Sequence, residues 1–340
     1  MSEGSPPQRK PWTSTPLLES RKLSGKAGCR VFLKLENTQP SSSFKSRGIG
    51  NYMLSNLQQH QNAASSSQNI HFYSSSGGNA GLACVTTAVF LKCKASVVVP
   101  TSTDQDMITK LREAGGTDII IHGDSWFYAD KYLRETVMEA AKARGETAIY
   151  VPPFDHPLIW EGASTMIDEM VDQMDERPDA IVCSVGGGGM FSGIMLGLDR
   201  HGWNKGQPVQ VLAVETNGAD SLAQAVAKKE WVTLPAITSV AKTLGALRVA
   251  ENAFKEALRD HVSTVVVEDS EACSACWHFA NDQRYLVEPS CGASLSLIYN
   301  GALKKYVKNF GPNSKVVVIV CGGSGISLEK LDAYRNDYGF

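Results

Sequence analysis

Apolar and polar residues alternate along the chain with two different periods. Short runs rich in Val, Ile and Leu that end at Gly, Ser or Pro are typical of buried strands, and longer segments with apolar residues three and four apart are typical of helices. Strands are predicted at 31–36, 69–74, 95–99, 118–121, 180–185, 209–214, 262–267 and 315–320. Helices are predicted at 49–59, 82–91, 105–114, 128–144, 158–174, 219–228, 249–258, 270–280 and 293–307, and two more after Gly189 and Ser324.

This alternation of strand and helix predicts an α/β fold with open parallel sheets and flanking helices. The segment Val151-Pro-Pro-Phe-Asp155 interrupts the rhythm, and we expect the chain to cross between domains there. Residues 51–150 are predicted to form a small domain, and residues 1–50 together with 151–340 a large one. We also expect a mobile tail at 1–12, a Ser-rich surface loop at 61–68 and an ill-defined segment at 237–244.

Composition narrows the class of protein. The formal net charge is 33 − 35 = −2, so no strong field indicates nucleic acid or a membrane surface as a partner. The first ten residues lack the apolar core of a signal peptide, and no apolar run is long enough to span a bilayer. We therefore expect a cytoplasmic protein without nucleic-acid or membrane partners and without an appended regulatory domain.

The chain has eight cysteines, and most of them lie in apolar runs, as buried thiols do. Cys273 and Cys276 form one Cys-x-x-Cys pair on a predicted helix. No second pair and no histidine at zinc spacing accompanies them, so we interpret the pair as structural.

A candidate nucleophile lies between the strand at 31–36 and the helix at 49–59. The connecting segment, Pro40-Ser-Ser-Ser-Phe-Lys-Ser-Arg-Gly48, has serines that can cap the helix and would place Lys45 at its start. A lysine there faces the positive end of the helix dipole, which favours the neutral, nucleophilic amine. Neutral lysines form Schiff bases with carbonyl compounds such as pyridoxal phosphate. Taken alone, the segment favours a surface lysine in a polar turn, because Ser-rich turns with a lysine are common.

Gly186-Gly-Gly-Gly189 follows a predicted strand and opens a helix. Glycines let backbone amides approach a phosphate, and the helix N-terminus adds its dipole. The segment is neither a P-loop, because no Gly-Lys-Ser/Thr follows, nor a dinucleotide fingerprint, because both registers of the pattern fail at Phe191 or Ser192. The alternative is a tight turn without a ligand.

Other polar turns also follow predicted strands, at the sheet edge where ligands bind in such folds. Ser75-Ser-Gly-Gly-Asn79 offers hydroxyls and amides to a carboxylate or a ring hydroxyl, although a helix cap would look the same. Cys321 ends a predicted strand before two glycines, and taken alone it favours a core cysteine. Glu288-Pro-Ser-Cys-Gly292 is compatible with a simple turn.

In this order the motifs resemble those of the fold-type II pyridoxal phosphate enzymes, whose fold is tryptophan synthase beta-like. The shared motifs are Thr-Pro-Leu at 15–17, Lys-Leu-Glu at 34–36, Ser-Ser-Phe-Lys-x-Arg-Gly at 42–48, Ser-x-Gly-Asn-Ala-Gly at 76–81, the four glycines at 186–189, Val-Glu-Pro-x-Cys-Gly-Ala at 287–293 and Cys-Gly-Gly-Ser at 321–324. Segments 152–155, 158–162 and 237–245 resemble the catabolic L-serine/L-threonine dehydratases in particular. The resemblance spans about residues 15–331.

The resemblance implies roles for specific residues. Lys45 would be the Schiff-base lysine and the catalytic base, with Phe44 beside the ring. Asn79 would bind the ring hydroxyl, and Cys321 would face the ring nitrogen. The phosphate would be held by Gly186, Gly187, Gly188 and Gly189. The substrate carboxylate would be bound by Ser76, Gly77, Gly78, Asn79 and Ala80.

The resemblance also implies a monovalent cation, for which we expect K+, and a homodimer. The expected cation ligands are Gly186, Glu215, Ala219 and Leu244. The implied reaction is the elimination of water from L-serine, giving pyruvate and ammonia, and from L-threonine, giving 2-oxobutanoate. This chemistry belongs to amino-acid catabolism and gluconeogenesis.

Several alternatives share the motifs. Serine racemase, threonine synthase and cysteine synthase have the same fold, and a silent α/β metabolite-binding protein is the non-enzyme alternative. Serine racemase carries a serine where this chain has Gly77, and glycine has no side chain to move a proton. We therefore expect little D-serine. We also expect Gly77, where many dehydratases have alanine, to leave the pocket roomier.

Overall fold

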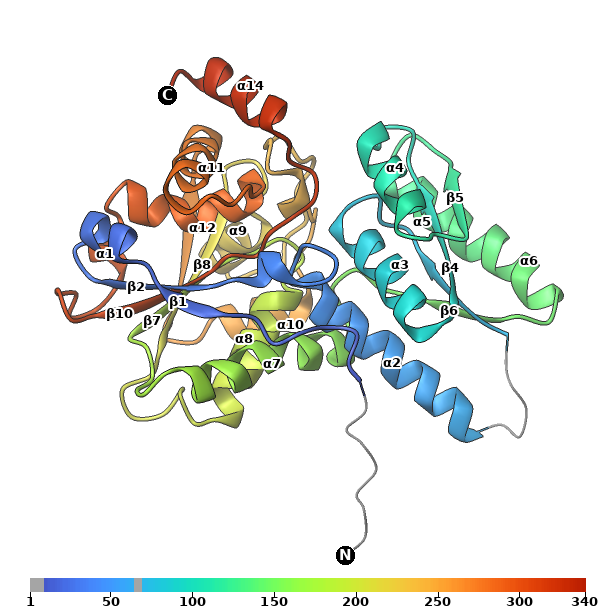
Figure 1. Ribbon diagram of the computed structural model, residues 1–340, viewed down its shortest axis with the longest axis horizontal. Helices are drawn as coiled ribbons and strands as arrows, with labels where there is room; N and C mark the ends of the chain where they lie inside the picture. Colours follow the sequence, from blue (N-terminus) through green and yellow to red (C-terminus); the bar gives the residue numbers. More distant parts are fainter. Residues whose placement is uncertain (1–8, 64–68) are drawn as a thin grey trace, which may run out of the picture.

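The computed structural model describes residues 9–63 and 69–340. Figure 1 shows two lobes, each built on its own sheet. The strands of the larger sheet are β1 (Leu17–Glu19), β2 (Arg30–Lys34), β7 (Ala180–Ser184), β8 (Gln210–Thr216), β9 (Val262–Val267) and β10 (Lys315–Ile319). They lie in the order β1-β2-β10-β7-β8-β9, and all neighbours are parallel except β1, which pairs antiparallel with β2.

Helices cover both faces of the larger sheet. They are α1 (Arg21–Ala27), α7 (Pro157–Gln173), α8 (Gly189–Arg200), α9 (Ser221–Lys228), α10 (Glu251–Ala257), α11 (Asp269–Gln283), α12 (Pro289–Tyr299), α13 (Leu303–Tyr306) and α14 (Leu328–Tyr338), with short helical turns η1 (Glu36–Thr38) and η3 (Lys242–Leu244). Helices α11 and α12 lie on one side of the sheet and α7 and α8 on the other (Figure 1). Strands β7 and β10 are apolar except at one end, and most residues of β2 and β8 are buried, because both faces of these strands are covered.

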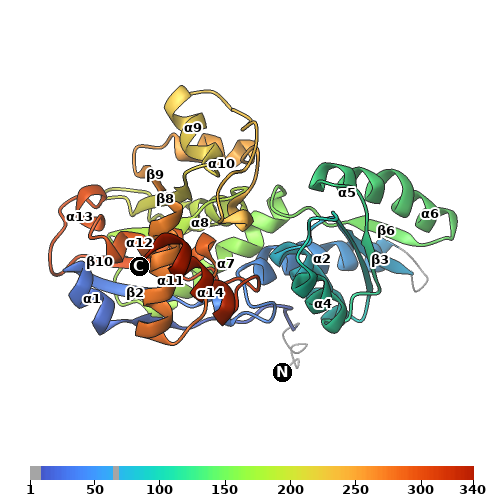
Figure 2. The same ribbon diagram turned by 90° about the horizontal axis from the view of Figure 1, so that it is seen from above.

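The smaller sheet has four parallel strands in the order β5-β4-β3-β6. They are β3 (Ile70–Ser74), β4 (Lys94–Val99), β5 (Asp118–Ile121) and β6 (Thr147–Tyr150). The helices around them are α2 (Lys45–Ala63), α3 (Asn79–Leu91), α4 (Gln105–Glu113), α5 (Trp126–Tyr132), the π-helical turn η2 (Leu133–Val137) and α6 (Met138–Ala143). Residues of α2, α3 and α4 pack on one face of this sheet and residues of α5 to α6 on the other, as Figure 2 also shows.

Several sequence predictions need correction. The expected helix at 49–59 is α2, which begins at Lys45 and ends at Ala63, so residues 61–63 are helical; the rest of the expected loop, 64–68, lies outside the described residues. The expected tail at 1–12 is wrong at its end, because Trp12 is buried and lies against Gly50; residues 1–8 lie outside the described part.

Other differences follow from local geometry. The helix expected at 293–307 is two helices, α12 and α13, separated at Gly301, which has a φ of +70°. The helix expected at 128–144 contains the π-helical turn η2. Strands β1 and β6 and helix α1 were not predicted, because their short segments show too little periodicity. The described residues include no helix with the length and hydropathy needed to cross a membrane.

Candidate active site

The strand order of the larger sheet brings three predicted loops together. Strands β2, β10 and β7 are neighbours. Strands β7, β8 and β9 follow one another towards one edge of the sheet, and the chain then reverses and inserts β10 between β2 and β7. In open α/β sheets the crevice at such a reversal, at the carboxyl ends of the strands, is where ligands bind. The loops that follow these three strands carry Lys45, Cys321 and the four glycines at 186–189.

The smaller sheet contributes the fourth loop. Strand β3 lies between β4 and β6, and residues 75–79 follow its carboxyl end. The N–H of Ser324 in the larger lobe donates a hydrogen bond of 2.9 Å to Oδ1 of Asn79. The loop after β10 also reaches Lys45, since the N–H of Phe44 donates to the carbonyl of Cys321 at 3.1 Å. Contacts therefore connect the Lys45 loop with the Asn79 loop across the two lobes.

Lys45 is the first residue of α2. Its Nζ donates a hydrogen bond of 2.6 Å to the carbonyl of Pro153, and it lies 5.2 Å from the ring centroid of Phe44 and 6.0 Å from that of Phe154. Burial lowers the pKa of Lys45 to about 8, although the nearby Cys321 acts in the opposite direction. The amine is thus neutral over a much larger part of the physiological pH range than that of an exposed lysine.

The expected serine cap of α2 is wrong in its detail. The N–H groups of Ser46 and Arg47 donate to the backbone carbonyls of Ser43 and Phe44, at 3.2 Å and 3.0 Å. The hydroxyl of Ser46 instead accepts from the N–H of Ser41 and so holds the preceding loop. Backbone carbonyls, and not the serine side chains that the sequence predicted, therefore accept hydrogen bonds from these first N–H groups of α2.

The glycine loop packs closely against two other segments, which carry Phe154 and Ala253. A Cβ at Gly187 would lie 2.3 Å from the ring of Phe154, and a Cβ at Gly188, whose φ is +90°, would lie 2.4 Å from Cβ of Ala253. Side chains at either position are therefore excluded. Among the described residues, no hydrogen bond runs from the N–H groups at 186–189 to a protein acceptor. These amides, at the N-terminus of α8, form a set of free donors for an anion.

The loop predicted to bind the substrate carboxylate is ordered by its own contacts. Ser76 Oγ accepts from the N–H of Gly78 at 3.3 Å, and Ala80 is already buried within α3. The expectation that Gly77 leaves the pocket roomier is wrong. A Cβ at Gly77 would lie 2.7 Å from Cγ2 and 2.8 Å from Oγ1 of Thr103, so the side chain of Thr103 already fills that space.

Comparison with known proteins identifies the group to which this site belongs. Residues 9–322 match the family model described as "Pyridoxal-phosphate dependent enzyme". The chain belongs to this family. An L-serine dehydratase of Saccharomyces cerevisiae is 40% identical over 328 residues, which cover 94% of this chain and 96% of that protein. A serine dehydratase-like protein of Homo sapiens is 43% identical over 328 residues, covering 96% and 94% of the two chains.

A solved structure agrees with these sequence matches. The fungal L-serine ammonia-lyase from Rhizomucor miehei superposes with a TM-score of 0.87 at 36% identity, over 97% of this chain and 100% of that one. The protein is therefore a fold-type II pyridoxal phosphate enzyme of the serine/threonine dehydratase family, as the motifs predicted.

The residues present fit this cofactor. The free N–H groups of the glycine loop match a phosphate dianion, and Lys45 supplies an amine whose pKa is lowered. Phe154 lies near both the glycine loop and Lys45. A Cβ at Gly187 would meet its ring, and its ring centroid lies 6.0 Å from Lys45 Nζ. These features place an anion site and an amine on the same edge of the larger sheet.

Cys321 lies two residues after β10, is only 6% exposed, and lies next to the first turn of α2. A hydrogen bond with Cys291 and burial raise the pKa of Cys321 well above the usual value of a thiol. The group at this position is therefore a neutral thiol. The predicted Cys-x-x-Cys pair, Cys273 and Cys276, is a separate feature. Both thiols are buried on α11, and both are free.

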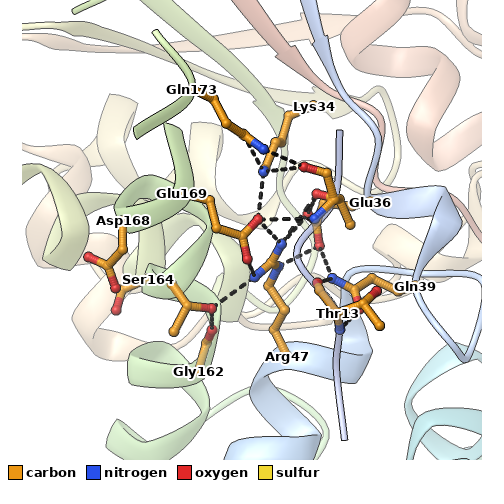
Figure 3. Close-up of polar contacts among 12 residues, drawn as sticks. Thr13, Lys34, Glu36, Gln39, Arg47, Gly162, Ser164, Asp168, Glu169 and Gln173 are labelled. Carbon is orange, nitrogen blue, oxygen red and sulfur yellow. Dashed lines mark hydrogen bonds and ion pairs between the residues drawn. The ribbon is translucent and has the colours of Figure 1, made fainter. Parts of the chain in front are cut away.

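A buried ion cluster, not predicted as part of the site, fixes the start of α2 (Figure 3). The Arg47 guanidinium is fully buried and bonds to the carboxylates of Glu36 and Glu169, with its shortest contacts at 2.7 Å and 2.6 Å. Lys34 Nζ donates to Glu169 at 2.6 Å and to the carbonyl of Thr15 at 2.8 Å. We call these five residues the Arg47 cluster. It joins β2, α2 and α7 two residues away from Lys45.

A second cluster was missed because its central residue resembled a turn. Glu288 precedes α12, is 5% exposed, and accepts hydrogen bonds from Asn79 and Thr243 and from the N–H of Gly325. The hydroxyls of Thr243 and Ser290 are also hydrogen-bonded to each other. We call these five residues the Glu288 cluster. Its only sequence signal was the Val-Glu-Pro motif.

One of the predicted cation ligands, Glu215, is a buried carboxylate. Glu215 is 0% exposed and accepts from the N–H groups of Leu222 and Ala223, at 2.9 Å and 2.7 Å, at the start of α9. Burial raises the pKa of Glu215 to about 8, and within the described part of the chain no cationic side chain is paired with it. Gly186 and Leu244 are neighbours, since a Cβ at Gly186 would lie 3.2 Å from the Leu244 carbonyl oxygen.

Proposed function

We propose that the protein is a pyridoxal-phosphate dependent ammonia-lyase that converts L-serine to pyruvate and ammonia. The observations that carry this proposal are two sets of contacts. Phe154 lies beside both Lys45 Nζ and Gly187, and the loop after β10 contacts both Phe44 and Asn79 of the other lobe. Relatives named L-serine dehydratase that match the chain over 94% of its length support the choice of substrate.

In this proposal Lys45 is the base. Pyridoxal phosphate, when bound, supplies the electron sink that stabilises negative charge at the substrate Cα. Nζ of Lys45 removes the Cα proton, and its pKa of about 8 keeps the amine available near neutral pH. The aromatic side chains of Phe44 and Phe154 exclude water around this amine.

The other site residues bind and orient. The N–H groups at 186–189 hold the phosphate, and the loop from Ser76 to Ala80 holds the substrate carboxylate. Cys321 would place a neutral thiol, and not a carboxylate, beside the ring nitrogen. A neutral neighbour would not favour protonation of that nitrogen, and the bound cofactor would then favour loss of the β-hydroxyl.

Three further points extend the proposal. We infer activity on L-threonine, which gives 2-oxobutanoate, from the family resemblance. We infer a K+ site at Gly186, Glu215, Ala219 and Leu244, because Glu215 is a buried carboxylate that lacks a cationic partner among the described residues. We also infer a homodimer of two-domain subunits, divided at 50/51 and 150/151, and this part rests on the resemblance together with the two separate sheets.

The test is a pyruvate assay on L-serine with the purified, cofactor-loaded protein, run beside L-threonine and D-serine. Pyruvate and ammonia formed from L-serine in equal amounts are the expected result. The racemase alternative predicts D-serine formed at a rate comparable to pyruvate, which chiral chromatography of the same reaction detects. A protein that takes up the cofactor and forms neither product is not a serine-transforming enzyme.

A further inference from the structure

The carboxylate of Glu288 is buried among neutral donors from both lobes. Its oxygens accept from Asn79 Nδ2 at 3.1 Å and 3.2 Å, from Thr243 Oγ1 at 2.6 Å and from the N–H of Gly325 at 2.6 Å. In the described part of the chain it has no ion pair with lysine or arginine. Buried charges without a counter-charge are unusual, so this carboxylate calls for an explanation beyond folding.

The close approach of Glu288 depends on a glycine. A Cβ at Gly323, whose φ is +122°, would lie 2.2 Å from Cδ of Glu288. Gly323 directly follows Cys321 and Gly322 in the loop after β10 and directly precedes Ser324. The loop after β10 is therefore shaped to let this carboxylate reach Asn79.

The contacts of Asn79 determine which way its amide points. An ionised carboxylate only accepts hydrogen bonds, so the Nδ2 end of the amide must face Glu288. The backbone N–H of Ser324 only donates, so the Oδ1 end must face Ser324, at 2.9 Å. Both neighbours select the same orientation of the amide, which hydrogen-bond networks normally decide.

This orientation decides what Asn79 can offer to a ligand. Nδ2 carries two hydrogens, and its nearly equal distances to the two Glu288 oxygens match one hydrogen shared between them. The second hydrogen remains for the site, whereas Oδ1 is occupied by Ser324. Asn79 thus presents a donor to a ligand, which suits an oxygen that carries negative charge.

We propose that Glu288 is a positioning residue that holds the amide of Asn79 with an N–H directed at the bound cofactor. The proposal rests on the proposed role of Asn79 at the ring oxygen. It assigns Glu288 no contact with the substrate. Its consequence is that the charge on the ring oxygen, and with it the absorbance of the bound cofactor, depends on a carboxylate 209 residues away in sequence from Asn79.

The test is a double-mutant cycle of Glu288→Gln and Asn79→Ala, measured on the cofactor-loaded protein. Glutamine keeps the shape of Glu288 but is a weaker acceptor, and its own N–H donors compete for Oδ1 of Asn79. Glu268→Gln is the matched control, because Glu268 also precedes a helix, α11, but is exposed and bonds within its own capping box. The readouts are the dissociation constant of pyridoxal phosphate and the ratio of its near-ultraviolet and near-visible absorbance bands.

The expected result is that Glu288→Gln weakens cofactor binding by about 10-fold, the scale of one hydrogen bond to a charged group, and shifts the band ratio. The same change should add little in the Asn79→Ala background, whereas Glu268→Gln should change neither readout. Equal effects of Glu288→Gln in both backgrounds, or a loss of activity with an unchanged band ratio, would overturn the proposal. Melting of the cofactor-free variants separates misfolding from misorientation, and variants that melt like the parent but bind the cofactor unchanged also overturn it.

This test is independent of the reaction. If the parent protein binds the cofactor but forms no pyruvate from L-serine, the proposed function fails while the cycle remains interpretable. If the band ratio does not respond to Asn79→Ala alone, Asn79 does not touch the ring oxygen, and the role of Glu288 falls with it.

Discussion

The Arg47 cluster and the Glu288 cluster both hold buried charge close to Lys45, but they balance it differently. The Arg47 cluster contains two cations, Lys34 and Arg47, and two carboxylates, Glu36 and Glu169, in direct contact (Figure 3). Within residues 9–63 and 69–340, the hydrogen-bond donors to Glu288 are all neutral. A cluster whose charges cancel internally has no use for a ligand, whereas a carboxylate held by neutral groups still acts on whatever lies next to it.

This contrast distinguishes polar groups that stabilise this fold from polar groups that act on a ligand. Burying charge is costly, so an ion cluster survives only if its partners are complete, and removing one of them destabilises the protein. Replacing a carboxylate that is hydrogen-bonded but has no cationic partner lowers the free energy of unfolding less, because a neutral side chain can take over its hydrogen bonds. Substitutions in the Arg47 cluster should therefore lower stability, and those around the Glu288 cluster should change the chemistry.

Substitution of Lys45 gives the largest expected effect. Lys45→Ala should lower the turnover of L-serine by at least about 10³-fold, because it removes the base that moves the Cα proton. The near-visible absorbance of the bound cofactor should disappear, while the melting temperature stays close to that of the parent because both clusters are intact. Turnover near the parent level would show that another residue performs this role.

Arg47→Met tests the balanced cluster. It leaves Glu36, which is fully buried, without a cation, and we expect unfolding free energy to fall by about 3–5 kcal/mol, as for other broken buried ion pairs. Urea unfolding of the cofactor-free protein measures this. Arg200→Met removes an arginine whose ion pairs are partly exposed, and serves as the control, with an expected loss of about 1 kcal/mol or less. If both variants unfold alike, the Arg47 cluster does not stabilise the start of α2.

The sequence predicted the local parts of the site better than the parts made by distant contacts. Lys45 and the four glycines could be found because a loop between strand and helix is a local pattern. Arg47 was visible only as a motif letter, because its partner Glu169 lies 122 residues further along the chain. Glu288 could not be found, because its role comes from a contact 209 residues apart. The space above Gly77 was misjudged for the same reason, since Thr103 arrives from another loop.

Glu215 allows a test of whether a buried carboxylate without a cationic partner binds the proposed K+. Its pKa in the folded protein is raised from 4.5 to about 8, so the folded state keeps a proton that the unfolded state has lost between these two pH values. In buffer without K+, stability should therefore fall as pH rises from about 4.5 to 8. Melting temperatures across this range should show the slope for the parent and a flatter profile for Glu215→Gln.

Addition of K+ should raise the melting temperature of the parent most at the upper end of this range, where the carboxylate is charged, and should not affect Glu215→Gln. Choline at the same ionic strength is the control for general salt effects. A K+ effect that is equal in the two proteins would place the cation elsewhere.

Substitution of Gly77 gives the smallest expected effect. It tests, through side-chain packing alone, the loop that carries Asn79 of the Glu288 cluster. Gly77→Ala adds a Cβ that would lie 2.7 Å from Cγ2 of Thr103, and since Thr103 is a partly exposed loop residue its side chain can shift, at a cost of about 1 kcal/mol. Because Gly77 precedes Asn79 by two residues, this shift should raise KM for L-serine a few-fold, with kcat and the melting temperature nearly unchanged. Thr103→Ala removes the two closest atoms, Cγ2 and Oγ1, and leaves only Val99 Cγ1 at 3.2 Å from the new Cβ among the nearest atoms, so the double variant should largely recover the parent KM. An equal KM in the single and double variants would show that Thr103 does not limit the space above Gly77, and D-serine formation should stay low in all of them because none gains a side chain that can carry a proton.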